Sequence, residues 1–228
     1  MQMINATVAR SSMPPAVAMR GPVTMPRRPT SEDGVRRSFS KGEELYAEGD
    51  AAEFFYKVVS GTVRICKVLN DGRRQIESFH LAGDIFGLER GKTHRFAAEA
   101  VEDLVVVVYR ARHLDVLVRD NPELGGQLMS SMLASLDRAR DHMVLLGRKS
   151  AREKIASFLL DTACRLGDGD HFDLPMQRAD IADHLGLTIE TVSRTLTQMA
   201  RDGLIKLAAC GRSVVLADRD SLEALEAA

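Results

Sequence analysis

Two hydrophobic patterns divide the chain near Tyr109. Between residues 39 and 110, short runs of alternating apolar and polar residues are separated by turn signals. The run at 62–68 is followed by a turn at 70–72, whose Asp-Gly pair is a strong signal for a β-hairpin. Many short strands joined by tight turns are typical of a β-sandwich or barrel. We therefore predict a β-roll domain over residues 31–111.

After Tyr109 the apolar residues recur at steps of three and four, which predicts one long helix over residues 112–147. The apolar stripe has two interpretations. It packs the helix against its own domain, or it forms the seam of a coiled-coil homodimer, and its heptad-like spacing favours the dimer. The residues of the predicted seam are Leu128, Met132, Leu136, Ala139, Met143 and Leu146.

A pair of short helices is predicted between residues 178 and 200. Ile181 and Leu185 are the inward positions of the first helix, and Gly186 permits a tight turn to the second, which Thr188 is placed to cap. The second helix has an apolar back of Ile189, Val192, Leu196 and Met199 and a polar front of Glu190, Ser193, Arg194 and Thr197. Short polar side chains with one arginine suit the major groove of DNA, so the pattern predicts a helix-turn-helix. An ordinary helical hairpin with a solvated face is the alternative.

Two β-type runs, at 204–207 and 213–216, follow the helix pair and flank Cys210. They form either a wing that contacts phosphate through Arg212 or a plain supporting hairpin. Cys210 is a candidate redox thiol close to DNA, although an inert wing cysteine is the favoured interpretation. The residues predicted to support DNA binding or contact phosphate are Thr188, Thr191, Thr197, Arg148, Lys149, Arg152, Arg178 and Arg212.

Composition narrows the class of protein. The 228 residues contain no apolar run long enough for a membrane-spanning helix. The three cysteines are too far apart for a disulfide framework, a zinc finger or a cysteine-ligated iron–sulfur cluster, and they fit a reducing cytoplasm. No nucleophile with a partnered histidine and acid, no Walker loop and no metal-type spacing is present, so we predict that the chain is not an enzyme. A net charge of −1 neither requires nor excludes nucleic-acid binding, so only a local basic face can argue for it.

The first thirty residues differ from the rest of the chain. Prolines and arginines crowd there, and no acidic residue comes before Glu32. Such a composition cannot build a core, so we predict a disordered arm over residues 1–30. A transit peptide is a less favoured alternative.

The sequence resembles the cyclic-AMP receptor protein/fumarate–nitrate regulator (CRP/FNR) superfamily and, within it, the FixK type. The resemblance covers roughly residues 35–225 and is carried by FSKGEELYAEGD, FYKVVSGTVRICKVLNDGRRQI, HLAGDIFGLE and DIADHLGLTIETVSRTLTQMARDGLI. It implies an α+β protein with an N-terminal double-stranded β-helix, a long dimerisation helix and a C-terminal winged helix-turn-helix domain over residues 148–228. It also implies that Glu190, Ser193 and Arg194 read bases in TTGAT-N4-ATCAA palindromes. The implied role is transcriptional activation of genes for low-oxygen respiration, nitrogen oxide metabolism or nitrogen fixation, with RNA polymerase as a partner.

The same resemblance bears on ligands. Arg95 is followed by Phe96, so the hydroxyl partner in the family's nucleotide-phosphate cassette is missing, and no cysteine precedes Cys66 to hold an iron–sulfur cluster. We therefore predict a cytoplasmic regulator that needs no effector, cofactor or metal. A member gated by a cyclic nucleotide, or by haem on His80, His94 or His113, remains an alternative, as does a sensor whose C-terminal module binds protein.

Overall fold

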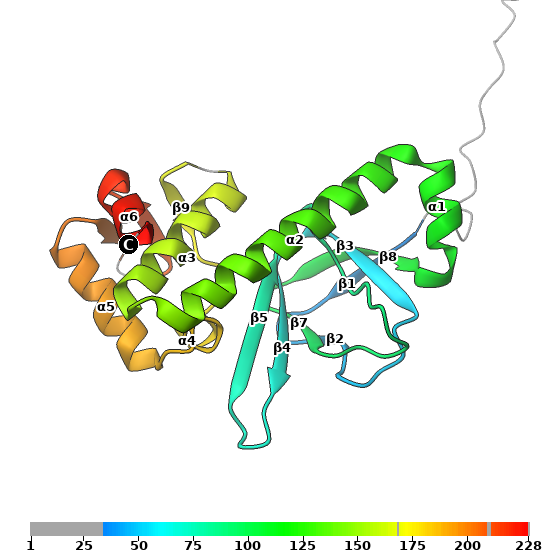
Figure 1. The fold of residues 1–228 in the computed structure, drawn as a ribbon, viewed down its shortest axis with the longest axis horizontal. Helices are drawn as coiled ribbons and strands as arrows, with labels where there is room; N and C mark the ends of the chain where they lie inside the picture. Colours follow the sequence, from blue (N-terminus) through cyan, green and yellow to red (C-terminus); the bar gives the residue numbers. More distant parts are fainter. Residues whose placement is uncertain (1–33, 168, 209–210, 228) are drawn as a thin grey trace, which may run out of the picture.

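The computed structural model describes residues 34–167, 169–208 and 211–227. Figure 1 shows a β-rich half and a mostly helical half joined by one long helix that runs along both. This order of elements confirms the expected α+β fold. The arm predicted over residues 1–30 and the candidate thiol Cys210 lie outside the described residues.

Two four-stranded antiparallel sheets form the β-rich half, with strand orders β1-β8-β3-β6 and β2-β7-β4-β5. Aliphatic and aromatic side chains from both sheets, among them Tyr46, Tyr56 and Leu104, form the core between them. The predicted Asp-Gly hairpin is present, because β4 and β5 pair antiparallel around Gly72, which has φ +82°. The strands are β1 (Val35–Phe39), β2 (Glu44–Tyr46), β3 (Phe54–Ser60), β4 (Val63–Val68), β5 (Arg74–His80), β6 (Ile85–Phe86), β7 (Ala97–Ala100) and β8 (Leu104–Arg110).

The helical region after β8 is not one continuous helix as predicted. A 3-10 turn, η1 (Ala111–His113), and a short helix, α1 (Leu114–Asp120), precede the long helix α2 (Pro122–Arg148). Pro122 causes the break, because the residue before a proline is pushed out of the helical region. Asn121 accordingly has φ −132° and ψ 84°, and its side chain accepts a hydrogen bond from the Leu124 amide as the N-cap of α2.

The predicted seam on α2 needs one correction. Leu128 is only 4% exposed and packs within its own chain in a cluster with Phe55, Ile85, Leu117 and Leu124. It belongs to the face of α2 that covers the β-roll, so its assignment to the dimer seam was wrong. The neighbouring side chain Met129 points outward instead and is 60% exposed.

The helical half contains a small sheet of order β10-β11-β9 beside four helices. Its elements are α3 (Ala151–Leu166), β9 (His171–Asp173), α4 (Arg178–Leu185), α5 (Ile189–Arg201), β10 (Ile205–Leu207), β11 (Ser213–Leu216) and α6 (Arg219–Glu226). One buried cluster joins this half to the β-roll, because Ile76 and Phe79 of β5 belong to the same core as Leu159 and Ile181. Strand β5 and helix α4 therefore lie against each other, as Figure 1 shows.

Candidate nucleic-acid interface

Helices α4 and α5 form the predicted helix-turn-helix. Ile181, Ala182 and Leu185 are buried, and α4 packs on α5. Gly186 ends α4 with φ +61°, a left-handed conformation that glycine adopts without steric cost. Thr188 caps α5, because its hydroxyl oxygen accepts a hydrogen bond of 3.2 Å from the Thr191 amide. The turn is thus fixed by local chemistry.

The back of α5 holds it on the protein. Val192, Leu196 and Met199 are almost fully enclosed, as their spacing predicts. Ile189 was expected on the same buried face, but it is 45% exposed. Side chains of a helix lean toward its N-terminus, so the side chain of this first helical residue extends past the end of α5 and away from the core.

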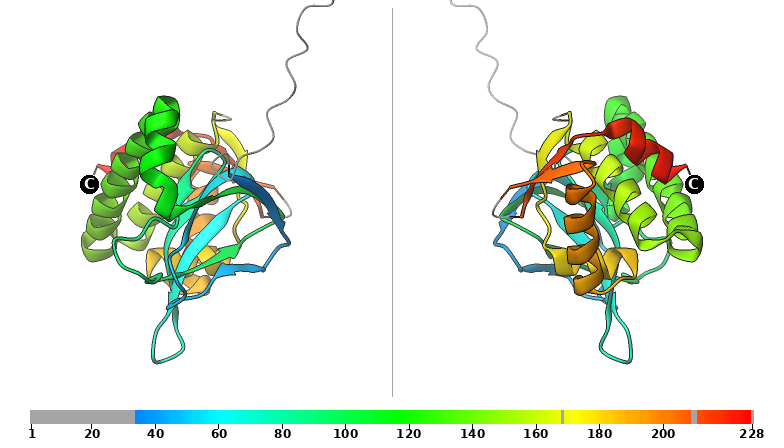
Figure 2. Two further views of the ribbon diagram at one scale, coloured as in Figure 1. Left: turned by 90° about the vertical axis from the view of Figure 1, so that its right-hand side faces the viewer. Right: turned by 90° about the vertical axis from the view of Figure 1, so that its left-hand side faces the viewer.

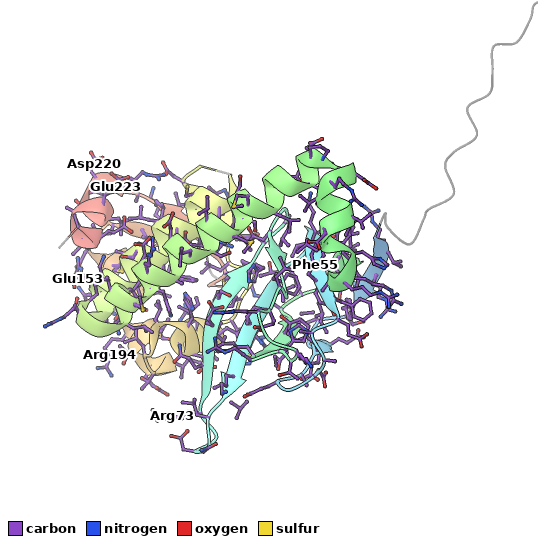
Figure 3. All side chains as sticks on the ribbon, turned by 45° about the vertical axis from the view of Figure 1, so that its right-hand side comes forward. Phe55, Arg73, Glu153, Arg194, Asp220 and Glu223 are labelled. Carbon is purple, nitrogen blue, oxygen red and sulfur yellow. The ribbon has the colours of Figure 1, made fainter. Side chains whose placement is uncertain are left out.

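The front of α5 is open to solvent. The right-hand view of Figure 2 shows α5 at the surface, and Figure 3 shows Arg194 on its outer side. Glu190, Arg194 and Thr197 are exposed and Ser193 is partly exposed. The pKa of Glu190 is lowered, first by its own backbone N–H at the helix start, then by a hydrogen bond with Thr188, and also by the charge of Arg194. A carboxylate and a guanidinium therefore stand one turn apart, where they can accept from and donate to base edges.

The basic residues predicted to contact phosphate fall into two groups. Arg148 and Arg212 are exposed, and the Arg178 guanidinium lies against Gly211, beside the β10–β11 hairpin. Lys149 and Arg152 already have partners inside the protein. The Lys149 ammonium donates to the Ser157 hydroxyl and to the Glu226 carbonyl, and Arg152 forms an ion pair of 2.6 Å with Asp202.

Charged residues that the sequence did not single out join α4 to the β-roll. Asp180 and Asp183 of α4 accept hydrogen bonds from Arg64 of β4 and Arg74 of β5. Two acids three residues apart on a short helix, with only Asp180 in its first turn, are a weak signal. Their partners lie more than a hundred positions away in the sequence, and no local pattern connects them.

A cavity of about 1160 Å³ lies between the β-roll, α2 and α3. Its lining includes Phe86, Gly87, Glu89 and Phe96 from the region that matches the nucleotide cassette. Arg95 does not line it and is exposed on the surface. Within the described residues there is no group of three or more histidine, cysteine or acidic side chains placed to hold a metal ion. None of the described helices is long and apolar enough to cross a membrane.

Comparison with known proteins agrees with this architecture. Residues 153–225 match the model of the Crp-like helix-turn-helix domain, and residues 36–121 match that of the cyclic nucleotide-binding domain. The nitrogen fixation regulation protein FixK of Azorhizobium caulinodans is 47% identical over 198 residues, which cover 85% of this chain and 79% of that protein. FixK of Bradyrhizobium diazoefficiens is 44% identical, covering 86% of this chain and 83% of that protein.

Among solved structures, FixK2 from Bradyrhizobium japonicum superposes with a TM-score of 0.79 at 45% identity. The match covers 86% of this chain and 98% of FixK2. Both halves of the fold, the long helix between them and the helix-turn-helix are thus shared with a FixK protein. The chain belongs to the CRP/FNR family of transcription regulators, as a member of the FixK type with a helix-turn-helix DNA-binding domain.

Proposed function

We propose that the protein is a transcriptional activator that binds TTGAT-N4-ATCAA palindromes as a homodimer. The observation that carries this proposal is the front of α5, where Glu190, Ser193 and Arg194 face away from the protein on a helix whose back is buried. Arginine donates two hydrogen bonds to guanine O6 and N7, and a carboxylate accepts one from the cytosine N4 amine. Glu190 and Arg194 together match a G·C pair, such as the one inside each TTGAT half-site.

A second copy of the chain is the partner that fits the free face of α2. Apolar side chains stay exposed along this helix, and Met129, Leu136 and Met143 lie seven residues apart. Such a heptad-spaced stripe is typical of a helix that pairs with a copy of itself. The proposed seam contains Met129, Met132, Leu133, Leu136, Ala139, Met143, Val144 and Leu146. A two-fold dimer also places two recognition helices about 34 Å apart, in successive major grooves.

The proposal includes binding without a small-molecule effector. Arg95, which matches the phosphate-binding arginine of the family, is exposed outside the cavity and is followed by Phe96. Arg95 therefore lacks both a place in the cavity and an adjacent hydroxyl with which to hold a cyclic phosphate. A rise in DNA affinity on adding cAMP, or a Soret band in the purified protein, would favour a ligand-gated member instead.

The names of the FixK relatives support a role in nitrogen fixation. We propose that the chain controls genes of nitrogen fixation or of low-oxygen and nitrogen-oxide respiration. It would act in the cytoplasm, where the DNA is, and recruit RNA polymerase to the promoters it binds. Arg148, Arg178 and Arg212 are the proposed phosphate contacts, because their guanidinium groups have no ion pair among the described residues.

Fluorescence anisotropy with a labelled palindrome tests the proposal, with a scrambled duplex of equal length as the control. We expect tight binding to the palindrome without any added ligand, and weak, strongly salt-dependent binding to the scrambled duplex. Equal affinity for both duplexes would exclude sequence-specific recognition. Mapping of bound genomic sites then identifies the genes and shows whether their motif is TTGAT-N4-ATCAA.

A further inference from the structure

The β4–β5 hairpin holds α4 through four charged side chains, and one of them, Arg64, also pairs with Glu99 of β7. Arg74 donates from Nη2 to Asp180 Oδ1 at 2.6 Å and from Nε to Asp183 Oδ2 at 2.8 Å. Arg64 donates from Nη1 to the same Asp180 oxygen at 3.0 Å. The two arginines belong to the β-roll and the two acids to the helix-turn-helix, so the cluster bridges the two halves of the molecule. We call these four residues the interdomain clamp.

The clamp is only partly open to solvent, because the side chains of Arg64, Arg74 and Asp183 are 17%, 26% and 31% exposed. Asp180 is 4% exposed, and its second carboxylate oxygen accepts from the Gln177 amide at the start of α4. Next to it, the His184 ring donates from Nδ1 to the Ile76 carbonyl at 3.1 Å, and the Gln75 amide donates to the His184 carbonyl at 3.3 Å. Backbone and side chains of β5 thus hold both ends of α4.

Buried ion pairs add little net stability, since desolvation offsets their attraction, but breaking one leaves a charge without a partner. Their geometry therefore favours one arrangement of two packed parts over others. Helix α4 packs directly on α5, so any rotation of α4 relative to β5 turns the front of α5 as well. In a dimer, the direction of the two α5 helices fixes the spacing of the half-sites they reach together.

We propose that Arg64 and Arg74 are positioning residues for DNA recognition, which act through Asp180 and Asp183 to set the direction of the recognition helix. The inference rests on the proposed function, because it assumes that α5 reads a palindrome. If the clamp opens, the competent orientation becomes one of several, and apparent affinity falls in proportion to its population. Binding to a single unspecific stretch of DNA does not depend on this orientation and changes little.

The test compares Arg74→Glu with Arg73→Glu in the full-length protein. Arg73 is the adjacent residue at the hairpin tip, where Figure 3 labels it. Its side chain is 78% exposed, and among the described residues it pairs only with Asp71. Both variants make the same charge change, but only Arg74→Glu places a negative charge against Asp180 and Asp183. Arg74→Gln, which removes the charge without repulsion, replaces Arg74→Glu if the latter does not fold.

Two measurements are made on each variant. Anisotropy gives the affinity for palindromes with the N4 spacer, with spacers one base pair shorter or longer, and for a scrambled duplex. Hydrogen–deuterium exchange of the free protein reports the opening of residues 178–185, independently of DNA. For Arg74→Glu we expect about ten-fold weaker binding to the N4 palindrome, reduced discrimination between spacers and nearly unchanged binding to the scrambled duplex. We also expect faster exchange in α4 and unchanged exchange in α5, whereas Arg73→Glu behaves as the wild type.

Two results would overturn the inference. One is equal exchange in α4 for the two variants. The other is faster exchange with the same affinity and spacer discrimination as the wild type, because the cluster would then be structural only. If the wild-type protein shows no preference for the palindrome, the proposed function fails, and the exchange data still decide whether the clamp holds α4. A swap of charges, Arg74→Asp with Asp183→Arg, should restore spacer discrimination lost in Arg74→Asp alone.

Discussion

The front of α5 and the β5–α4 contact use the same kinds of side chain in opposite surroundings. On α5, Glu190 and Arg194 are exposed and bind little within the protein. At the contact, Asp180 and Arg74 are largely enclosed and bound to each other. An exposed charge costs the fold little and is free for a partner, whereas an enclosed pair fixes the geometry around it. The first region is suited to reading DNA bases, and the second is suited to setting the orientation of the recognition helix.

The largest expected effect comes from a substitution on the exposed front of α5. Arg194→Ala should lower specific DNA affinity by about 2–6 kcal/mol, because a bidentate guanine contact contributes about 1–3 kcal/mol and a dimer makes it twice. The thermal unfolding temperature should stay unchanged, because Arg194 is exposed. Anisotropy on the palindrome and on scrambled DNA measures the specific and the non-specific affinity.

The control for Arg194 is Arg201, which is exposed at the end of the same helix. Arg201→Ala should weaken binding to all sequences alike, as expected for a phosphate contact. Glu190→Ala should relax the base preference and retain more affinity than Arg194→Ala. If Arg194→Ala keeps the preference for TTGAT half-sites, another residue reads the base.

A substitution at the enclosed β5–α4 contact should change the stability of the fold. Asp180→Ala leaves the Arg64 and Arg74 guanidinium groups without their shared partner, and it removes the hydrogen bond to the Gln177 amide. Arg64 keeps its ion pair with Glu99, and Arg74 keeps its hydrogen bond to Asp183. The free energy of unfolding should therefore fall by about 1–3 kcal/mol, the cost of the lost charge-assisted hydrogen bonds. Urea denaturation measures the loss. A change of only a few tenths of a kcal/mol would show that water replaces the carboxylate without cost.

The same contrast explains what the sequence could predict. The helix-turn-helix is recognisable because its signals are local: Gly186 permits the turn, Thr188 caps α5, and Val192 and Leu196 recur at helical spacing. The β4–β5 hairpin is recognisable for the same reason, through Asp71 and Gly72. Each of these features depends on residues within about one or two turns of each other.

Features that depend on distant contacts were missed or misassigned. Leu128 fits the apolar spacing of the seam, but only the packing of α2 on Phe55 and Ile85 shows that it faces inward. The clamp joins Arg74 to residues more than a hundred positions later. Periodicity identifies an apolar stripe, but it does not say whether the stripe meets the protein's own core or a second chain.

Acid should destabilise the fold in part through His184, which lies at the β5–α4 contact. Burial, and then the neighbouring His142, lower the pKa of His184 from 6.5 to about 3, so the folded protein keeps this ring neutral. The unfolded chain takes up a proton near pH 6.5, and the stability that neutral His184 allows is lost as pH falls from about 6.5 toward 3. At pH 5 the loss from this residue should be on the order of 2 kcal/mol.

Urea denaturation at pH 7 and pH 5 measures this loss, and His184→Gln should remove that part of it. The front of α5 should keep its charges over the same interval, because the pKa of Glu190 is lowered. Base preference at pH 5 should therefore match that at pH 7 while the protein remains folded. A stability difference between the two pH values that is equal in His184→Gln and wild type would assign the acid sensitivity to other groups.

The last comparison is between two environments within one helix, and Ile189→Ala has the smallest expected effect of all. Ile189 and Leu196 are both aliphatic residues of α5, but Ile189 is 45% exposed and Leu196 is 1% exposed. Leu196→Ala should lower the free energy of unfolding by about 2–5 kcal/mol, because it removes buried surface and leaves a cavity. Ile189→Ala should cost less than about 1 kcal/mol, since much of its side chain is already in water. Urea denaturation of the two variants measures this difference, and both substitutions remove the same number of carbon atoms. Similar losses for both would mean that Ile189 is covered in solution, either by a second subunit or by the protein's own core, as its spacing predicts.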